Sequence, residues 1–190
     1  MLICNLISAI AQAGLLTIEV IYIKDVLGGG EVGYGLLYTV CGIGALAASA
    51  MITPLTRRFS LTGVYVACVL FTGLIYFPYG NIQILWVAIP LAVIHTIPWV
   101  ISWILRDTIV QTWAPEAMRG RVISLFSAQE GAGQILVALI FAPLTDLWGV
   151  RTILNISGVL YTLLGIYAVV QRGVLSAVEK RQKGTNYGAV

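Results

Sequence analysis

Long apolar runs separated by short polar segments dominate the chain, and they predict helices that cross a membrane. Crossing the hydrocarbon core takes about 20 apolar residues, and backbone groups in lipid must be paired internally, so such runs form helices rather than open strands. The predicted spans are residues 2–23, 32–51, 62–77, 84–105, 122–142 and 152–170. We therefore expect an all-α membrane protein with one six-helix transmembrane domain, residues 1–172, and a basic cytoplasmic tail, residues 173–190.

The composition of the chain indicates the same class of protein. Of its 190 residues, 59% are hydrophobic and only 10% are charged. Soluble domains carry about 25% charged residues, so this chain lacks the polar side chains that a water-facing surface needs. Its three cysteines, Cys4, Cys41 and Cys68, lie inside apolar runs and are expected to act as small hydrophobic residues.

The basic residues gather on one side of the predicted bundle. Those that follow the second, fourth and sixth spans are Arg57, Arg58, Arg106, Arg119, Arg121, Arg172, Lys180, Arg181 and Lys183. Only Lys24 and Arg151 belong to the other side. Because loops rich in Lys and Arg stay in the cytoplasm, we expect both termini there, in a multi-pass protein of the plasma or inner membrane. The loops at residues 24–31, 78–82 and 146–151 are then expected outside.

Two short sequences recur at a fixed spacing. Pro54-Leu-Thr recurs as Pro143-Leu-Thr, 89 residues later, and Val69-Leu-Phe-Thr is matched by Val159-Leu-Tyr-Thr, 90 residues later. Because this spacing covers three helices, an odd number, the two copies must cross the membrane in opposite orientations. The recurrence predicts a 3+3 inverted repeat, with units at about residues 1–80 and 81–172, as in half of a secondary transporter.

Polar residues inside the predicted spans are candidates for transport, because such groups are costly in lipid and face the bundle interior. Glu130 is expected roughly 13 Å into its helix at 1.5 Å per residue, near the midplane, and is the candidate for proton coupling or for contact with a cationic substrate. The candidates for the substrate path share this interior placement and are Asn5, Gln12, Glu19, His95, Trp99, Gln129 and Gln134.

Each candidate also has a purely structural interpretation. Glu130 would be a hydrogen-bonded carboxyl among polar neighbours, and Glu19 would pair with Lys24 or reach the headgroups. His95 would be a satisfied interior histidine, Trp99 would fill the core, and the side-chain amides would link helices by hydrogen bonds. A further group of basic residues at the cytoplasmic side either fixes the topology or gates the path: Arg57, Arg58, Arg119 and Arg121.

Three segments, at residues 25–37, 115–125 and 142–151, resemble the major facilitator superfamily. The segment at 115–125, Pro-Glu-Ala-Met-Arg-Gly-Arg-Val-Ile-Ser-Leu, resembles a cytoplasmic loop-to-helix entry of its drug, macrolide and siderophore exporter branch. The segment at 25–37 resembles the outer loop and entry of that branch's eighth helix. In the third segment, Asp146, Gly149 and Arg151 match the outer loop motif Gly-x-Leu-x-Asp-Arg-x-Gly-x-Arg, from which Ala142 and Leu147 depart.

The resemblance implies the C-terminal six-helix half of a major facilitator fold, present as a half or fragment of a transporter. The implied function is secondary active transport, as a proton-coupled efflux antiporter for a small hydrophobic or amphipathic compound. The implied partners are the lipid bilayer, the small-molecule substrate, and a missing N-terminal six-helix half or a second copy. The alternative is a six-helix membrane protein that assembles with partners and does not transport.

Other chemistry finds no support in the sequence. There is no phosphate-binding loop, no cluster of Cys and His at metal-ligand spacing, and no GxSxG motif. An intramembrane enzyme needs a nucleophile with a base, and the chain holds a single histidine. We therefore expect no enzymatic activity, no cofactor, no metal and no nucleic-acid partner.

Overall fold

The computed structural model describes residue 12, residues 18–171 and residue 173, and these residues are helical apart from short connections. The elements are η1 (Tyr22–Val26), α2 (Gly30–Arg58), α3 (Leu61–Asn81), α4 (Leu85–Trp113), η2 (Glu116–Met118), α5 (Arg119–Trp148) and α6 (Val150–Val170). The helices α2 to α6 are long and apolar enough to cross a membrane. Residues 18–21 are also helical and lead into the π-helical turn η1. The architecture is consistent with the predicted six-helix half of a transporter.

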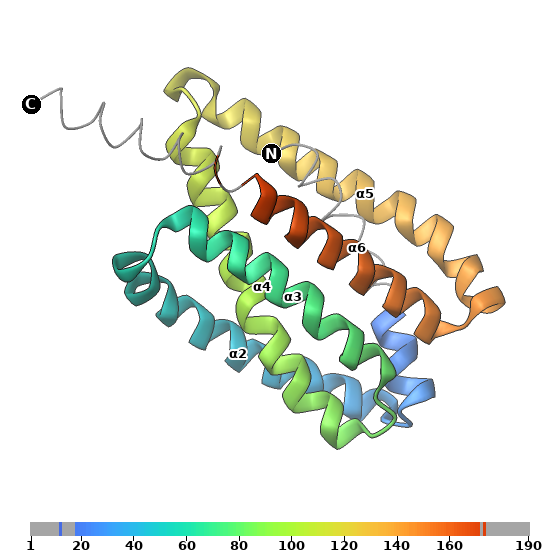
Figure 1. Cartoon of the computed structure of the whole chain (residues 1–190). Helices are drawn as coiled ribbons and strands as arrows, with labels where there is room; N and C mark the ends of the chain where they lie inside the picture. The colour runs from blue at the N-terminus through green and yellow to red at the C-terminus, as the bar shows by residue number, and fades with distance from the viewer. Residues whose placement is uncertain (1–11, 13–17, 172, 174–190) are drawn as a thin grey trace, which may run out of the picture.

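The helices run alternately up and down, so their connections gather at two ends of the bundle (Figure 1). The α2–α3 and α4–α5 connections lie at one end, and η1 lies with the α3–α4 and α5–α6 connections at the other. The most extensive packing joins α3 to α6, and α4 packs against both α3 and α2. The connections are short because each pair of neighbours in sequence runs antiparallel.

The contact between α3 and α6 is close enough to require glycine. A Cβ atom at Gly73 would lie 2.5 Å from the backbone nitrogen of Thr162, so any side chain there would force the two helices apart. Asn81 reinforces the same contact by donating a hydrogen bond to the Asn155 Oδ1 atom at 2.9 Å. Residues 73 and 162 are 89 positions apart, as expected if a two-fold axis of the inverted repeat passes between α3 and α6. The repeat itself stays a prediction.

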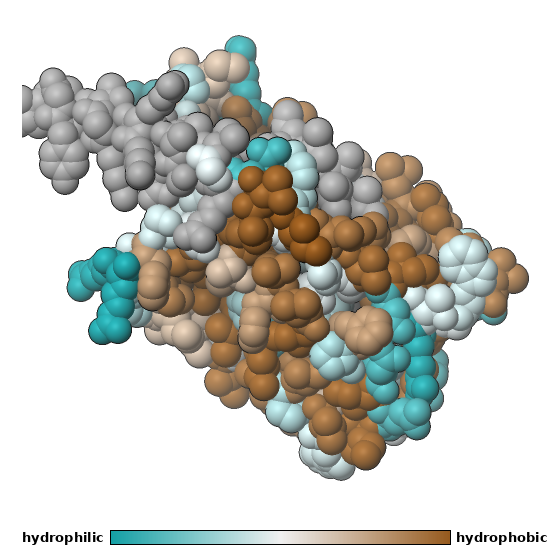
Figure 2. Space-filling view, in the orientation of Figure 1, coloured by the Kyte–Doolittle hydropathy of each residue, from teal (hydrophilic) through white to brown (hydrophobic). Residues whose placement is uncertain are grey.

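The helices differ in how much of their apolar surface the protein buries. In the most apolar window of α3, 50% of the residues are buried, against 17% in α2 and 17% in α5. Apolar side chains cover most of the face drawn in Figure 2, and hydrophilic ones gather towards the helix ends. This distribution is that of a bundle whose sides face a hydrocarbon environment.

The apolar runs underestimated the lengths of the helices. α2 ends at Arg58 rather than residue 51, and α4 ends at Trp113 rather than residue 105. Pro78, expected to end the third span, lies inside α3. Helical hydrogen bonding needs no apolar side chains, so the helices continue into the polar segments on either side of each run.

Several predicted loop residues therefore lie on helices. Arg57 and Arg58 form the end of α2, and Arg119 and Arg121 lie in the first turn of α5. Asp146 belongs to α5 and Arg151 to α6, and only Gly149 separates these helices, with φ +81°, a conformation that suits glycine. Arg106, assigned to a cytoplasmic loop, instead lies inside α4 with 8% of its surface exposed.

Candidate functional site

A cavity of about 250 Å³ lies between the N-terminal helical segment, α2, α3 and α4. Its lining is mostly apolar and aromatic, and we call it the Glu19 pocket: Gln12, Glu19, Leu37, Tyr38, Cys41, Gly42, Ala45, Tyr76, Ala92, His95, Thr96 and Trp99. Four residues predicted for the substrate path thus come together in one cavity, namely Gln12, Glu19, His95 and Trp99. Asn5, the remaining candidate on the first predicted span, lies outside the described residues.

The carboxyl group of Glu19 is bonded to tyrosines rather than to a basic residue. Tyr79 donates a hydrogen bond to Oε1 at 2.8 Å, and Tyr38 donates one to Oε2 at 3.2 Å. Lys24, considered as its partner, forms an ion pair with Glu31 at 2.5 Å instead. Residues five positions apart do not share a helix face, whereas those three or four apart do. Glu19 is 7% exposed, so its contacts lie inside the bundle rather than among headgroups.

Tyr22 fixes the position of Tyr79 at the end of α3. Its single hydroxyl proton is shared between two backbone carbonyl oxygens, that of Tyr79 at 2.8 Å and that of Ile82 at 2.6 Å. The last carbonyls of a helix have no partner within the helix, and Tyr22 adds a donor at this end of α3, where the Tyr79 carbonyl also accepts from the Ile82 amide at 3.3 Å. The two tyrosine rings also pack with their centroids 5.7 Å apart. The π-helical turn and α3 together therefore hold the Tyr79 hydroxyl against Glu19.

Two further polar groups of the pocket lack partners. In the described part of the chain, neither the hydroxyl of Tyr76 nor Nε2 of His95 forms a hydrogen bond, although both atoms are buried. The two rings meet edge to face at 4.5 Å, and the Tyr76 ring also stacks on that of Tyr161 at 5.3 Å. A buried polar group without a partner costs about 1–3 kcal/mol, so these two atoms lower the stability of the packing around the pocket.

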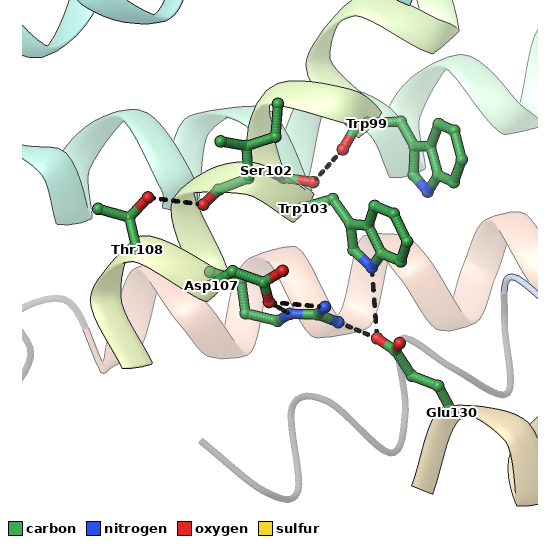
Figure 3. Close-up of polar contacts among 8 residues, drawn as sticks. Trp99, Ser102, Trp103, Asp107, Thr108 and Glu130 are labelled. Carbon is green, nitrogen blue, oxygen red and sulfur yellow. Dashed lines mark hydrogen bonds and ion pairs between the residues drawn. The ribbon is translucent and has the colours of Figure 1, made fainter. Parts of the chain in front are cut away.

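Glu130 lies in a second polar cluster, between α4 and α5 (Figure 3). Its Oε1 atom forms an ion pair with Nη1 of Arg106 and accepts a hydrogen bond from Nε1 of Trp103 at 3.3 Å. Arg106 also donates to Oδ1 of Asp107, through Nε at 3.1 Å and Nη2 at 2.9 Å. Its guanidinium lies 6.0 Å from the ring centroid of Phe126. The cluster borders a smaller cavity of about 160 Å³.

The sequence prediction missed the pairing of Glu130 because it placed Arg106 outside the membrane. The two residues are 24 positions apart and on different helices, so no local spacing connects them. The signal that was present is the helical spacing of His95, Trp99 and Ser102 on the predicted span 84–105, which Arg106 continues one residue past its end. A basic residue that continues such a stripe belongs to the helix rather than to the loop.

The other predicted residues lie apart from both cavities. Gln134 is exposed and Gln129 partly buried on α5, and neither lines the Glu19 pocket. The predicted gating residues are exposed at helix ends: Arg57, Arg58, Arg119 and Arg121. The outer motif residues Asp146, Gly149 and Arg151 surround the turn between α5 and α6, also exposed. Their assigned roles stay predictions.

Within the described residues, no three His, Cys, Asp or Glu side chains are grouped as a metal site would require. The comparisons with known proteins then identify the class of molecule. The profile of the family described as Major Facilitator Superfamily matches residues 1–187. No curated protein and no solved structure gave a match.

Proposed function

Because this chain belongs to the Major Facilitator Superfamily, we propose that it forms part of a proton-coupled transporter that exports a small hydrophobic or amphipathic compound. The family comprises multi-pass membrane transporters rather than enzymes, so the chain is a transport protein of a lipid bilayer with a small-molecule substrate. Four parts of this function are proposals: that the chain belongs to the exporter branch, that it is the C-terminal half, that transport is outward, and that transport is coupled to protons.

The observation that carries the proposal is the Glu19 pocket. Small-molecule sites are concave and mostly apolar, with a few placed polar groups, and here Glu19 and His95 lie among aromatic and small aliphatic side chains. Pockets for drug-sized ligands measure about 300–1,000 Å³, so a cavity of about 250 Å³ favours a small compound. Four candidates from two different predicted spans, Gln12 and Glu19 on one and His95 and Trp99 on the other, line this one cavity.

The ion pair of Glu130 is the proposed site of proton coupling. Protonation of Glu130 would remove the negative charge that attracts Arg106, and so would weaken the polar link between α4 and α5. Removing one charge of a buried pair leaves the other uncompensated, so Arg106 would then have to move or rely on Asp107. Proton uptake at this position would thereby change the packing of α5 against α4, which also contributes His95 and Trp99 to the pocket.

A second six-helix unit, either an N-terminal half or another copy of this chain, is the proposed partner. In this family's architecture the substrate lies between two halves, and α2 and α5 are the spans with the least buried apolar windows in the described residues. A partner half placed against them would cover this surface and complete the path. The exposed arginines at the ends of α2 and α5 would then meet the partner at the predicted cytoplasmic side.

Inverted or right-side-out vesicles containing the transporter test this function directly. An imposed proton gradient should drive a small amphipathic dye across the membrane, and Glu130→Gln should abolish gradient-driven movement while the protein still inserts. Movement that is equally fast with and without the gradient would contradict the coupling. Unchanged gradient-driven movement in Glu130→Gln would contradict the assignment of Glu130.

A further inference from the structure

We propose that the Glu19 pocket is a site for a small organic cation, whose positive charge pairs with the Glu19 carboxylate and whose body lies against the aromatic rings of the pocket. This inference rests on the proposed transport function and specifies its substrate class. It also separates the roles of two acidic residues, since it assigns the substrate's charge to Glu19 rather than to Glu130.

Glu19 has no counter-charge among the described residues. Each Glu19 oxygen accepts a hydrogen bond from a tyrosine hydroxyl, so within the described residues the carboxyl group is held by two neutral donors and by no cation. The ion pairs found among the described residues join Lys24 to Glu31 and Arg106 to Asp107 and Glu130, and none of them includes Glu19. A buried charge without a partner is costly, so a cation entering this pocket is stabilised by the carboxylate.

The walls of the Glu19 pocket are rich in aromatic side chains. Tyr38, Tyr76, His95 and Trp99 contribute four aromatic side chains to the lining. A cation within about 6 Å of an aromatic ring is attracted by the ring's negative face, most strongly by tryptophan. The ring of Trp99 stacks on that of Trp103 with centroids 6.1 Å apart and planes 15° apart, which restrains its orientation (Figure 3).

The Glu19 pocket suits an organic cation better than a metal ion. Hard metal ions take six or more oxygen ligands, whereas the pocket offers one carboxylate whose oxygens already accept from Tyr38 and Tyr79. The remaining lining, including Leu37, Ala45 and Ala92, is apolar and suits a hydrocarbon body. An ammonium group on an aromatic or branched aliphatic body matches both parts of the cavity. Among the described residues no lysine or arginine lines the pocket, so an anion would meet no permanent positive charge there.

The cavity beside Glu130 can be compared with the Glu19 pocket in the same protein. It is bordered by Trp103 and by two carboxylates, Asp107 and Glu130, but Arg106 lies in its wall and already pairs with both. A second cation there would be repelled by the guanidinium. Each cavity thus has a tryptophan and a glutamate in its wall, but the cavity beside Glu130 also has a guanidinium there, which opposes the binding of a cation.

The test measures binding of trimethylphenylammonium to the purified chain in detergent by isothermal titration calorimetry. This probe carries a permanent charge, so its binding does not depend on its own protonation. Benzenesulfonate, of similar size and opposite charge, is the comparison ligand. The wild-type chain should bind the ammonium saturably and the sulfonate not at all. Glu19→Gln should weaken ammonium binding about tenfold or more, because it removes a buried charge partner.

Matched variants keep the result interpretable. Glu31→Gln removes an exposed carboxylate outside the pocket and should leave binding unchanged. Gly42→Leu places a side chain at a pocket-lining position where a Cβ meets no atom within 4 Å, and it should also weaken binding about tenfold or more. Gly35→Leu adds the same side chain to open space on the same helix but outside the pocket, so it should bind as wild type. If Glu19→Gln does not fold, the difference in binding between Gly42→Leu and Gly35→Leu tests the proposal instead.

Failure of this proposal differs from failure of the proposed function. Three results would overturn the cation site: wild type does not bind the ammonium, it binds the sulfonate equally well, or Glu19→Gln binds the ammonium as tightly as wild type does. Each would do so even if gradient-driven transport of a neutral dye is observed. Specific ammonium binding without any gradient-driven movement would support the cation site and overturn proton-coupled transport instead.

Discussion

Glu19 and Glu130 are two largely buried carboxylates in one helical bundle, and their surroundings are opposite. Glu130 lies against a guanidinium that belongs to the protein, Arg106, which in turn contacts Asp107. Glu19 lies against two tyrosine hydroxyls and a cavity. A carboxylate with a built-in cation links helices and responds to its own protonation. A carboxylate held only by neutral donors can accept a cation that arrives and leaves.

The largest expected effect comes from removing the built-in cation. Arg106→Leu leaves Glu130 buried without its partner and should lower the free energy of unfolding by about 3 kcal/mol. Arg58→Leu removes an exposed arginine at the end of α2 and should change stability by less than about 0.5 kcal/mol. Unfolding in mixed detergent micelles measures both. Equal stability of the two variants would show that the ion pair does not hold α4 to α5.

A smaller effect is expected at the other carboxylate. Tyr79→Phe keeps the ring beside Tyr22 but removes the hydroxyl that donates to Glu19 at 2.8 Å. Hydrogen bonds to charged groups contribute about 1.5–3 kcal/mol, so unfolding should become easier by about 2 kcal/mol. The same unfolding assay measures the change, and a loss below about 0.5 kcal/mol would mean that Glu19 is not an ionised acceptor of this bond.

Tyr38 should contribute less to Glu19 than Tyr79 does. Its hydroxyl is 3.2 Å from Oε2, and the residue is 40% exposed, so water can replace the bond in Tyr38→Phe. We expect a loss of about 0.5–1 kcal/mol in the free energy of unfolding. A loss larger than that of Tyr79→Phe would reverse the order that distance and burial predict.

The smallest effect is expected at the indole of Trp103. Trp103→Phe removes a hydrogen bond of 3.3 Å to Glu130, whose charge Arg106 still neutralises. The free energy of unfolding should fall by about 0.5 kcal/mol. Because Arg106 rather than Trp103 holds Glu130, a loss as large as that of Arg106→Leu would contradict the assignment of the ion pair as the main link.

The sequence was sufficient for the fold class and for part of the site. Apolar run length alone indicates spanning helices, and helical spacing placed Glu19, His95 and Trp99 on interior faces of their helices. These interior faces line the Glu19 pocket when the helices pack together. Helix ends were predicted less well, because α3 continues past Pro78 and α4 past residue 105, where the apolar signal has already ended.

The partners of the two carboxylates could not be predicted because they depend on tertiary contacts. Tyr79 is 60 positions from Glu19, and Arg106 is 24 positions from Glu130. Lys24 is the nearest basic residue to Glu19 in sequence, yet it pairs with Glu31 on α2. Sequence proximity therefore suggested the wrong counter-ion for Glu19, and the assignment of Arg106 to a loop hid the right one for Glu130.

The most direct test of the contrast between the two acids compares two transport modes of the same ammonium probe in vesicles containing the transporter. Counterflow exchanges labelled for unlabelled probe without a proton gradient, whereas export requires the gradient. Glu130→Gln should retain counterflow and lose gradient-driven export, because the binding pocket is intact and the coupling group is not. Glu19→Gln should lose both. Retained counterflow in Glu19→Gln, or its loss in a folded Glu130→Gln variant, would contradict the division of roles proposed for these residues.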